Sequence, residues 1–213
     1  PLEYIEKLND ISVFNYKTRA AVVKTYIGYI IVVLLLTFIL MVYLKRYLYY
    51  VRPLLISILI TPTVLLFLPI FNPWNTARLT VSLILSVLVI SLAVSYLFKD
   101  NLTIFIVTCF FSTGIILVDT FLKNPLMKVS ILGYDPIAGL RFYGIGNEYM
   151  GFLLGTTIIG TAALIDRYRD KGKGVKILSI AICTVVLITL MAPTLGTNVG
   201  GSMAAFIGFG ISN

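Results

Sequence analysis

Apolar residues fill the chain in six runs, and the short segments between them hold most of the charges. The runs cover residues 26–44, 54–71, 79–98, 102–121, 149–165 and 177–191. Each run is close to the ~17–25 residues that a helix needs to cross a bilayer. A seventh apolar pattern begins near Gly200 and predicts a partial or re-entrant helix. The pattern therefore predicts an all-α, polytopic helical transmembrane bundle with six complete spans.

The composition supports the same class of protein. Of the 213 residues, 59% are hydrophobic and 12% are charged, whereas soluble domains carry about 25% charged residues. Only a bundle that satisfies its backbone hydrogen bonds internally suits such a chain in a bilayer. The net charge of +8 does not indicate a nucleic-acid partner, because the basic residues lie at the ends of the apolar runs. The expected partner is the lipid bilayer.

Residues 1–24 are the one segment that resembles soluble protein, since it mixes acidic and basic residues. We expect a juxtamembrane linker over 1–24 and a transmembrane helical domain over 25–213. The chain starts at Pro1 without an initiator methionine and stops within a helical pattern. It is therefore expected to be a fragment of a longer polypeptide.

The basic residues also predict an orientation. The loops after the first, third and fifth runs hold nine Lys and Arg residues, and the loops after the second, fourth and sixth hold four. Because cytoplasmic loops are enriched in Lys and Arg, we expect the N-terminus and segments 133–151 and 193–202 outside. The basic residues of the leading segment argue the opposite way, but charge matters less beside a long translocated domain.

The longest interruption contains segment 133–151, GYDPIAGLRFYGIGNEYMG. The planar guanidinium of Arg141 suits a phosphate or a carboxylate. Glycines such as Gly144 and Gly146 allow positive φ and a close approach of the backbone to a ligand. We therefore predict that these three residues bind an anionic substrate. The alternative is that Arg141 pairs with Asp135 or Glu148.

A second segment, PTLGTNVGGS at 193–202, repeats the order of glycine, asparagine and glycine-rich helix start. Two helix N-termini on one face of the membrane favour an anionic group there. Asn147, Asn198 and Gly200 therefore join the candidate substrate-binding residues. Asn147 is also predicted to be the N-cap of the fifth helix, with Glu148 in its first turn. Asp135 and Glu148 are candidates for proton transfer, although the sequence leaves open whether the protein is an enzyme.

The same glycines have a structural alternative, because small residues four positions apart allow helices to pack closely. The pairs are Gly151/Gly155, Gly196/Gly200 and Gly201/Ala205.

Two residues inside apolar runs predict local contacts. Asp119, near the end of the fourth run, is expected to pair with Lys123 at i+4. Pro62 is expected to kink the second helix, since membrane helices tolerate proline when neighbours satisfy the carbonyl that it leaves free.

Several kinds of chemistry are excluded. The chain has no histidine, which removes the commonest general base and zinc ligand. It contains no phosphate-binding loop, dinucleotide fingerprint, HExxH or CxxC motif. We therefore expect no metal and no cofactor.

The two polar segments resemble a group of bacterial polytopic membrane proteins. The shared signature is G-Y-x-P-x-x-G-x-R-[FY]-Y-G-I-G-N-E, followed by P-x-x-G-x-N-x-G-G. The resemblance implies a bacterial plasma membrane location and an upstream extracytoplasmic, phosphatase-like domain in the same chain. A looser likeness to the O-antigen polymerase and ligase superfamily rests on Arg141, Gly144 and Asn147. Those enzymes typically use an external histidine, which this chain lacks.

Three functions remain open. The first is a cell-envelope domain that binds or processes an anionic, lipid-linked phosphate substrate at its outer face. The second is a transporter or flippase for such a substrate, and the third is a membrane anchor for the upstream domain. The only acid inside an apolar run is Asp119, near the outer end of that run. This scarcity of polar groups along the spans favours function at the outer face.

Overall fold

The computed structural model describes residues 2–71, 74–139, 141–169 and 173–212. Within these ranges the chain forms seven α-helices and no strand. Six helices are long and apolar enough to cross a membrane: α1 (Leu2–Tyr43), α2 (Leu48–Phe67), α3 (Thr76–Leu97), α4 (Asn101–Phe121), α5 (Asn147–Arg167) and α6 (Lys173–Met191). The seventh, α7 (Val199–Ser212), has 14 residues. The predicted all-α bundle with six spans and a shorter seventh helix is confirmed.

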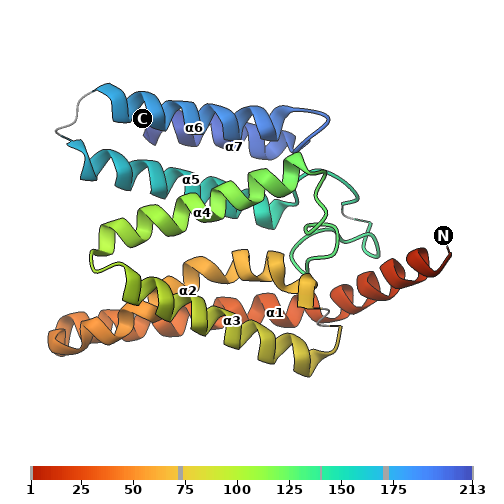
Figure 1. Ribbon diagram of the computed structural model, residues 1–213, viewed down its shortest axis with the longest axis horizontal. Helices are drawn as coiled ribbons and strands as arrows, with labels where there is room; N and C mark the ends of the chain where they lie inside the picture. The colour runs from red at the N-terminus through yellow and green to blue at the C-terminus, as the bar shows by residue number, and fades with distance from the viewer. Residues whose placement is uncertain (1, 72–73, 140, 170–172, 213) are drawn as a thin grey trace.

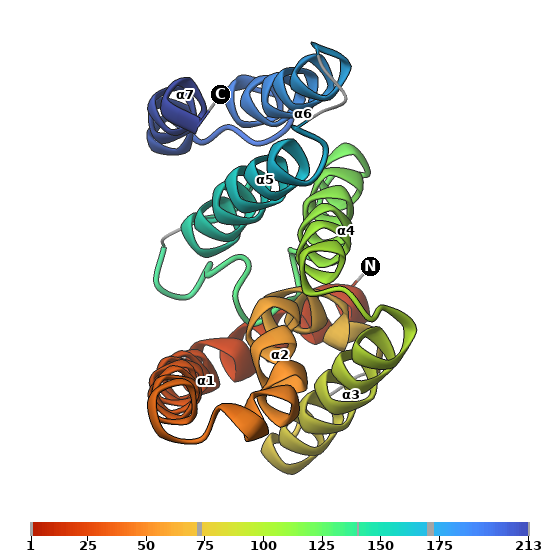
Figure 2. The same ribbon diagram turned by 90° about the vertical axis from the view of Figure 1, so that its left-hand side faces the viewer.

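The helices run alternately up and down the bundle, so their connections gather at two ends (Figure 1). The α2–α3, α4–α5 and α6–α7 connections lie at one end together with the N-terminus; we call it the loop end. Helices α1–α3 form one group and α4–α7 form another, and α2 contacts α4 between them (Figure 2). The two glycine-rich segments therefore share one end of the bundle.

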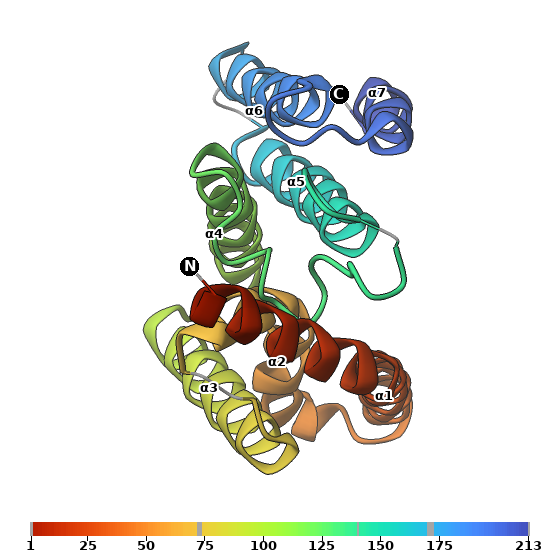
Figure 3. The same cartoon turned by 90° about the vertical axis from the view of Figure 1, so that its right-hand side faces the viewer.

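Helix α1 is longer than a single span requires. Its 42 residues extend about 63 Å at 1.5 Å per residue, about twice the hydrocarbon thickness of a bilayer. Its leading part crosses the loop end obliquely before the rest runs along the bundle (Figure 3). The segment predicted as a linker is thus helical from Leu2 and continues into the first span without a break.

The leading part of α1 is packed against the loop end. Ile11 and Asn15, four residues apart, are both buried. The Asn15 side-chain amide donates a hydrogen bond to the Val129 carbonyl at 3.0 Å. Phe14 meets Trp74 edge to face, with ring centroids 6.3 Å apart. This part of α1 therefore covers the connections rather than projecting away from them.

Pro62 lies inside α2. Because proline has no N–H, the carbonyl of Ile58, four residues earlier, loses its helical donor. The hydroxyl of Tyr26 in α1 donates to that carbonyl at 2.7 Å. A neighbouring helix thus satisfies the free carbonyl.

Pairs of buried hydroxyls join the helices inside the bundle. Thr63 of α2 donates to Ser112 of α4 at 2.8 Å, and Thr113 of α4 meets Thr156 of α5 at 2.9 Å. Interhelical hydrogen bonds of this kind stabilise contacts between membrane helices.

The small-residue alternative is correct for only part of the chain. A Cβ added to Gly201 would lie 2.5 Å from the side chain of Met150, and Ala205 is fully buried. In contrast, a Cβ at Gly151 or Gly155 would meet nothing within 4 Å. Close packing through this glycine pair was therefore a wrong prediction for the described residues.

Candidate functional site between two loops at one end of the bundle

The connection from α4 to α5 is organised first by Asp119. This residue is 3% exposed, and its two carboxylate oxygens accept the backbone amides of Leu126 at 2.9 Å and Met127 at 3.1 Å. Lys123 is exposed and forms no ion pair with Asp119. The predicted Asp119–Lys123 pair is wrong, because α4 ends at Phe121 and i+4 geometry does not extend past it.

A buried hydrogen-bond network then fixes the middle of this connection. The Ser130 hydroxyl donates to the Leu65 carbonyl of α2 at 2.9 Å and lies 2.6 Å from the Tyr149 hydroxyl of α5. Both Ser130 and Tyr149 are fully buried. A Cβ on Gly133 would lie 1.8 Å from the Met127 carbonyl oxygen, so only glycine fits this turn. The loop is therefore held against two helices.

The two glycine-rich segments touch through their backbones. The Ile145 amide donates to the Gly196 carbonyl at 2.8 Å, and the Asn198 side-chain amide donates to the Ile145 carbonyl at 3.0 Å. Gly144 has φ +72°, and a Cβ there would lie 2.2 Å from the Gly196 carbonyl oxygen. These contacts bring the starts of α5 and α7 together.

The capping residues differ from those predicted. Asn147 is the first residue of α5 rather than its N-cap; Gly146 takes the cap position and supplies no side-chain bond. Gly146 has φ −63°, so the positive φ expected there is also wrong. The Asn198 side-chain oxygen accepts the Gly201 amide at 2.8 Å and caps α7. Gly200 is exposed in the first turn of α7.

Arg141 is held by backbone carbonyls. Its Nη1 donates to the Ile145 carbonyl at 2.8 Å, and its side chain is half-buried. Two further acceptors, each 3.5 Å away, are the carbonyls of Tyr143 and Thr197. Among the described residues no carboxylate pairs with Arg141. The structure therefore does not show the alternative in which Arg141 pairs with Asp135 or Glu148.

The cation that does pair with these acids is Arg19, which sequence analysis missed. Arg19 Nη2 lies 2.5 Å from Glu148 Oε1, and Nη1 lies 3.5 Å from Asp135 Oδ2. Nη1 also lies 3.4 Å from the Gly133 carbonyl. The only link between Arg141 and Asp135 in the described chain is a backbone bridge, in which the Asp135 amide donates to the Arg141 carbonyl at 3.3 Å.

A signal for Arg19 exists in the sequence. It follows Ile11 and Asn15 at intervals of four, and residues four apart share one helix face. That face is the one packed on the loop end. The pattern could not identify the acids that the face would meet, because they lie more than 110 residues away.

Tyr134 lies between the turn after α4 and the Arg141 segment. Burial raises the pKa of its phenol, while the neighbouring Asn124 side chain and Gly144 amide favour the ionised form. The hydroxyl therefore stays protonated at neutral pH and acts as a hydrogen-bonding group. In the part of the chain that the structure describes, no three His, Cys, Asp or Glu residues are placed to hold a metal ion.

No protein-family model matches this chain, and neither the curated proteins nor the solved structures compared with it give a match. The fold itself defines the class: an integral membrane domain built as a polytopic helical bundle.

Proposed function

We propose that this membrane domain binds an anionic group at its loop end, with Arg141 as the anchoring cation. The observation that carries the proposal is the division of charges there. Asp135 and Glu148 both pair with Arg19, while the contacts of Arg141 in the described chain are neutral carbonyls. No carboxylate among the described residues therefore neutralises the charge of Arg141.

The geometry of Arg141 suits this role. Carbonyl contacts through Nη1 fix one edge of the guanidinium, and Nε and Nη2 form no hydrogen bond within the described part of the chain. A planar guanidinium with a free edge can bind a phosphate or carboxylate through two parallel hydrogen bonds. Because the side chain is half-exposed, an anion can reach it from outside the bundle.

The helix starts around Arg141 support the same ligand chemistry. Asn147 and Asn198 hold the beginnings of α5 and α7 together through a 3.3 Å contact between their side chains. Helix N-termini carry partial positive charge and unpaired amides. Gly144, Gly146 and Gly200 keep side-chain bulk away from these starts. In this proposal Arg141, Asn147 and Gly200 face the ligand, because they are exposed or half-exposed. The other three predicted binding residues, Gly144, Gly146 and Asn198, are buried and hold the two helix starts in place.

Binding at one face is favoured over transport through the bundle. The buried polar groups along the spans are mainly hydroxyls bonded to carbonyls or to one another. Among the described acids of the spans only Asp119 is buried, and backbone amides occupy both of its oxygens. Glu148 and Asp135 remain the candidates for proton transfer if the domain processes its ligand.

The wider setting of the proposal rests on the sequence. The family resemblance supports a bacterial plasma membrane location and an upstream extracytoplasmic domain. The lipid-linked phosphate substrate is proposed from the anion-binding chemistry of Arg141 at one end of a membrane bundle. The excess of Lys and Arg at the opposite end of the bundle supports a loop end and an N-terminus outside.

Thermal unfolding of the detergent-solubilised domain with added pyrophosphate tests the proposal. A ligand that binds only the folded state raises the unfolding temperature with concentration. We expect this rise for the natural protein and for Arg78→Ala, which removes an exposed arginine from the same end. Arg141→Ala should abolish it. An equal rise in Arg141→Ala would overturn the proposal.

A further inference from the structure

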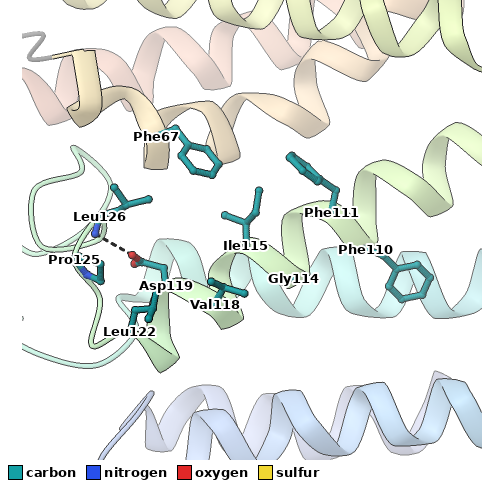
Figure 4. Close-up of a pocket in the computed structure, with 10 residues that line it drawn as sticks. All are labelled: Phe67, Phe110, Phe111, Gly114, Ile115, Val118, Asp119, Leu122, Pro125 and Leu126. Atoms are coloured by element: carbon teal, nitrogen blue, oxygen red, sulfur yellow. Dashed lines mark hydrogen bonds between the residues drawn. The ribbon is translucent and has the colours of Figure 1, made fainter.

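An apolar groove runs between the end of α2 and the outer face of α4 (Figure 4). It has a volume of about 470 Å³ and is open on one side. Phe67 lies on one wall, Phe111 and Ile115 lie on the other, and the turn at Pro125 and Leu126 closes the end nearest the loops. The volume is within the ~300–1,000 Å³ typical of ligand pockets.

The described side chains around this groove leave room for a ligand. Gly114 lies on its α4 side, and a Cβ added there would meet no atom within 4 Å. Phe111 and Val118 on the same helix are 52% and 56% exposed. Since α4 is a candidate membrane span, the open side faces hydrocarbon. A hydrocarbon chain is the ligand that this lining can accept without burying a polar group.

The closed end of the groove carries positive charge. Lys123 follows the lining residue Leu122, and Lys128 lies within electrostatic range of Asp119; both lysines are exposed. The Asp119 carboxylate is occupied by two backbone amides. Two lysines against this one carboxylate leave a net charge of +1 where the apolar groove meets the membrane surface.

We propose that the groove binds one acyl chain of an anionic phospholipid, whose headgroup phosphate contacts Lys123 and Lys128. The apolar lining takes the chain, and the lysine pair selects the charge of the headgroup. A basic residue near a membrane surface favours anionic lipid by about fivefold. This site uses residues other than Arg141 and goes beyond the proposed function.

Quenching by brominated lipid in nanodiscs tests the proposal. The chain has one tryptophan, so Trp74→Phe with Phe111→Trp places a single reporter in the groove. We expect brominated phosphatidylglycerol to quench this reporter about threefold to tenfold more effectively than brominated phosphatidylcholine at equal mole fraction. A reporter at Leu35, a 57% exposed residue of α1 about ten residues from the nearest basic residue on either side, serves as the control and should show no such preference.

Two sets of substitutions test the headgroup contact and the acyl-chain contact separately. Lys123→Glu with Lys128→Glu should abolish the preference, whereas Lys7→Glu with Arg78→Glu, at exposed positions of the same end, should retain it. Gly114→Leu should fill the groove and reduce quenching by both lipids. Gly28→Leu, at a helical glycine that is equally uncrowded, should not. Three results would overturn the proposal. The first is equal quenching by both lipids, and the second is quenching by neither because a second copy of the protein fills the groove. The third is a preference for phosphatidylglycerol that survives the lysine substitutions.

Discussion

Arg19 and Glu148 lie 129 positions apart in the chain, yet Nη2 of the arginine is 2.5 Å from Oε1 of the glutamate. The contact joins the leading part of α1 to the first turn of α5. Together with the Asn15 contact to Val129, it makes the leading helix part of the candidate site. The segment that the sequence predicts to be a linker thus supplies the cation that pairs with Asp135.

Arg19→Ala should lower the free energy of unfolding by about 1–2 kcal/mol, because the largely buried Asp135 then keeps its hydrogen bond from the Ala138 amide but loses its cationic partner. The ion pair with Glu148 adds little to this loss of stability, because the Glu148 side chain is 43% exposed and solvent weakens the pair. Lys17→Ala, at an exposed position two residues away, is the matched control. Chemical unfolding in detergent measures both. Adding Asp135→Asn to Arg19→Ala should restore part of the loss; equal stability of the Arg19 and Lys17 variants would refute the pairing.

Tyr26→Phe should cost about 1 kcal/mol, because the Ile58 carbonyl freed by Pro62 then has no donor. Pro62→Ala restores the helical N–H, so the same tyrosine substitution should cost clearly less in that background. Tyr43→Phe, at an exposed position of α1, controls for loss of a hydroxyl. The comparison is a double-mutant cycle on unfolding free energies. An unchanged cost in the Pro62→Ala background would show that the tyrosine acts through other contacts.

Alanine substitutions at Gly139 and Gly144 distinguish the cost of backbone strain from the cost of steric crowding. Both have positive φ, at +69° and +72°, but only a Cβ at Gly144 meets another atom, the Gly196 carbonyl oxygen. Gly139→Ala should therefore cost only the strain of about 1 kcal/mol. Gly144→Ala should cost about 1–3 kcal/mol more, because the contact between the loops must open. Thermal unfolding measures the stability of both variants. Similar losses of stability in the two would mean that Gly144 and Gly196 are not in close contact.

The proposed orientation is tested by labelling single cysteines in intact cells with an impermeant maleimide. Cysteines at Thr76, Ile137 and Thr194, all exposed at the loop end, should react from outside. A cysteine at Gly174, exposed at the opposite end, should react only after permeabilisation. The natural cysteines are both buried and should stay silent. Labelling at Gly174 alone would reverse the orientation.

The number and nature of the helices could be predicted because length and hydropathy are local properties of the chain. The proximity of the two loops could also be predicted, since alternating spans place 133–151 and 193–202 at one end.

Predictions from local spacing were wrong at the ends of helices. Asp119 and Lys123 satisfy the i+4 spacing, but α4 stops between them. At α5 the helix begins one residue earlier than a cap at Asn147 requires.

The partners of the charged residues could not be predicted from the sequence. Segment 133–151 offers Arg141 two nearby acids, and short separation along the chain favours that pairing. The fold instead brings Arg19 to both acids and surrounds Arg141 with carbonyls. This outcome depends on the path of α1 across the loop end, which no short window of sequence specifies.

The claim that Arg141 anchors an anion is tested most directly by titrating pyrophosphate into the solubilised domain in a calorimeter. The natural protein and Arg78→Ala should bind alike. Arg141→Lys should bind at least about tenfold more weakly, since it keeps the charge but loses paired hydrogen bonds worth about 1.5–3 kcal/mol, and Arg141→Ala should give no measurable heat of binding. Binding by folded Arg141→Ala with the affinity of the natural protein would contradict the claim.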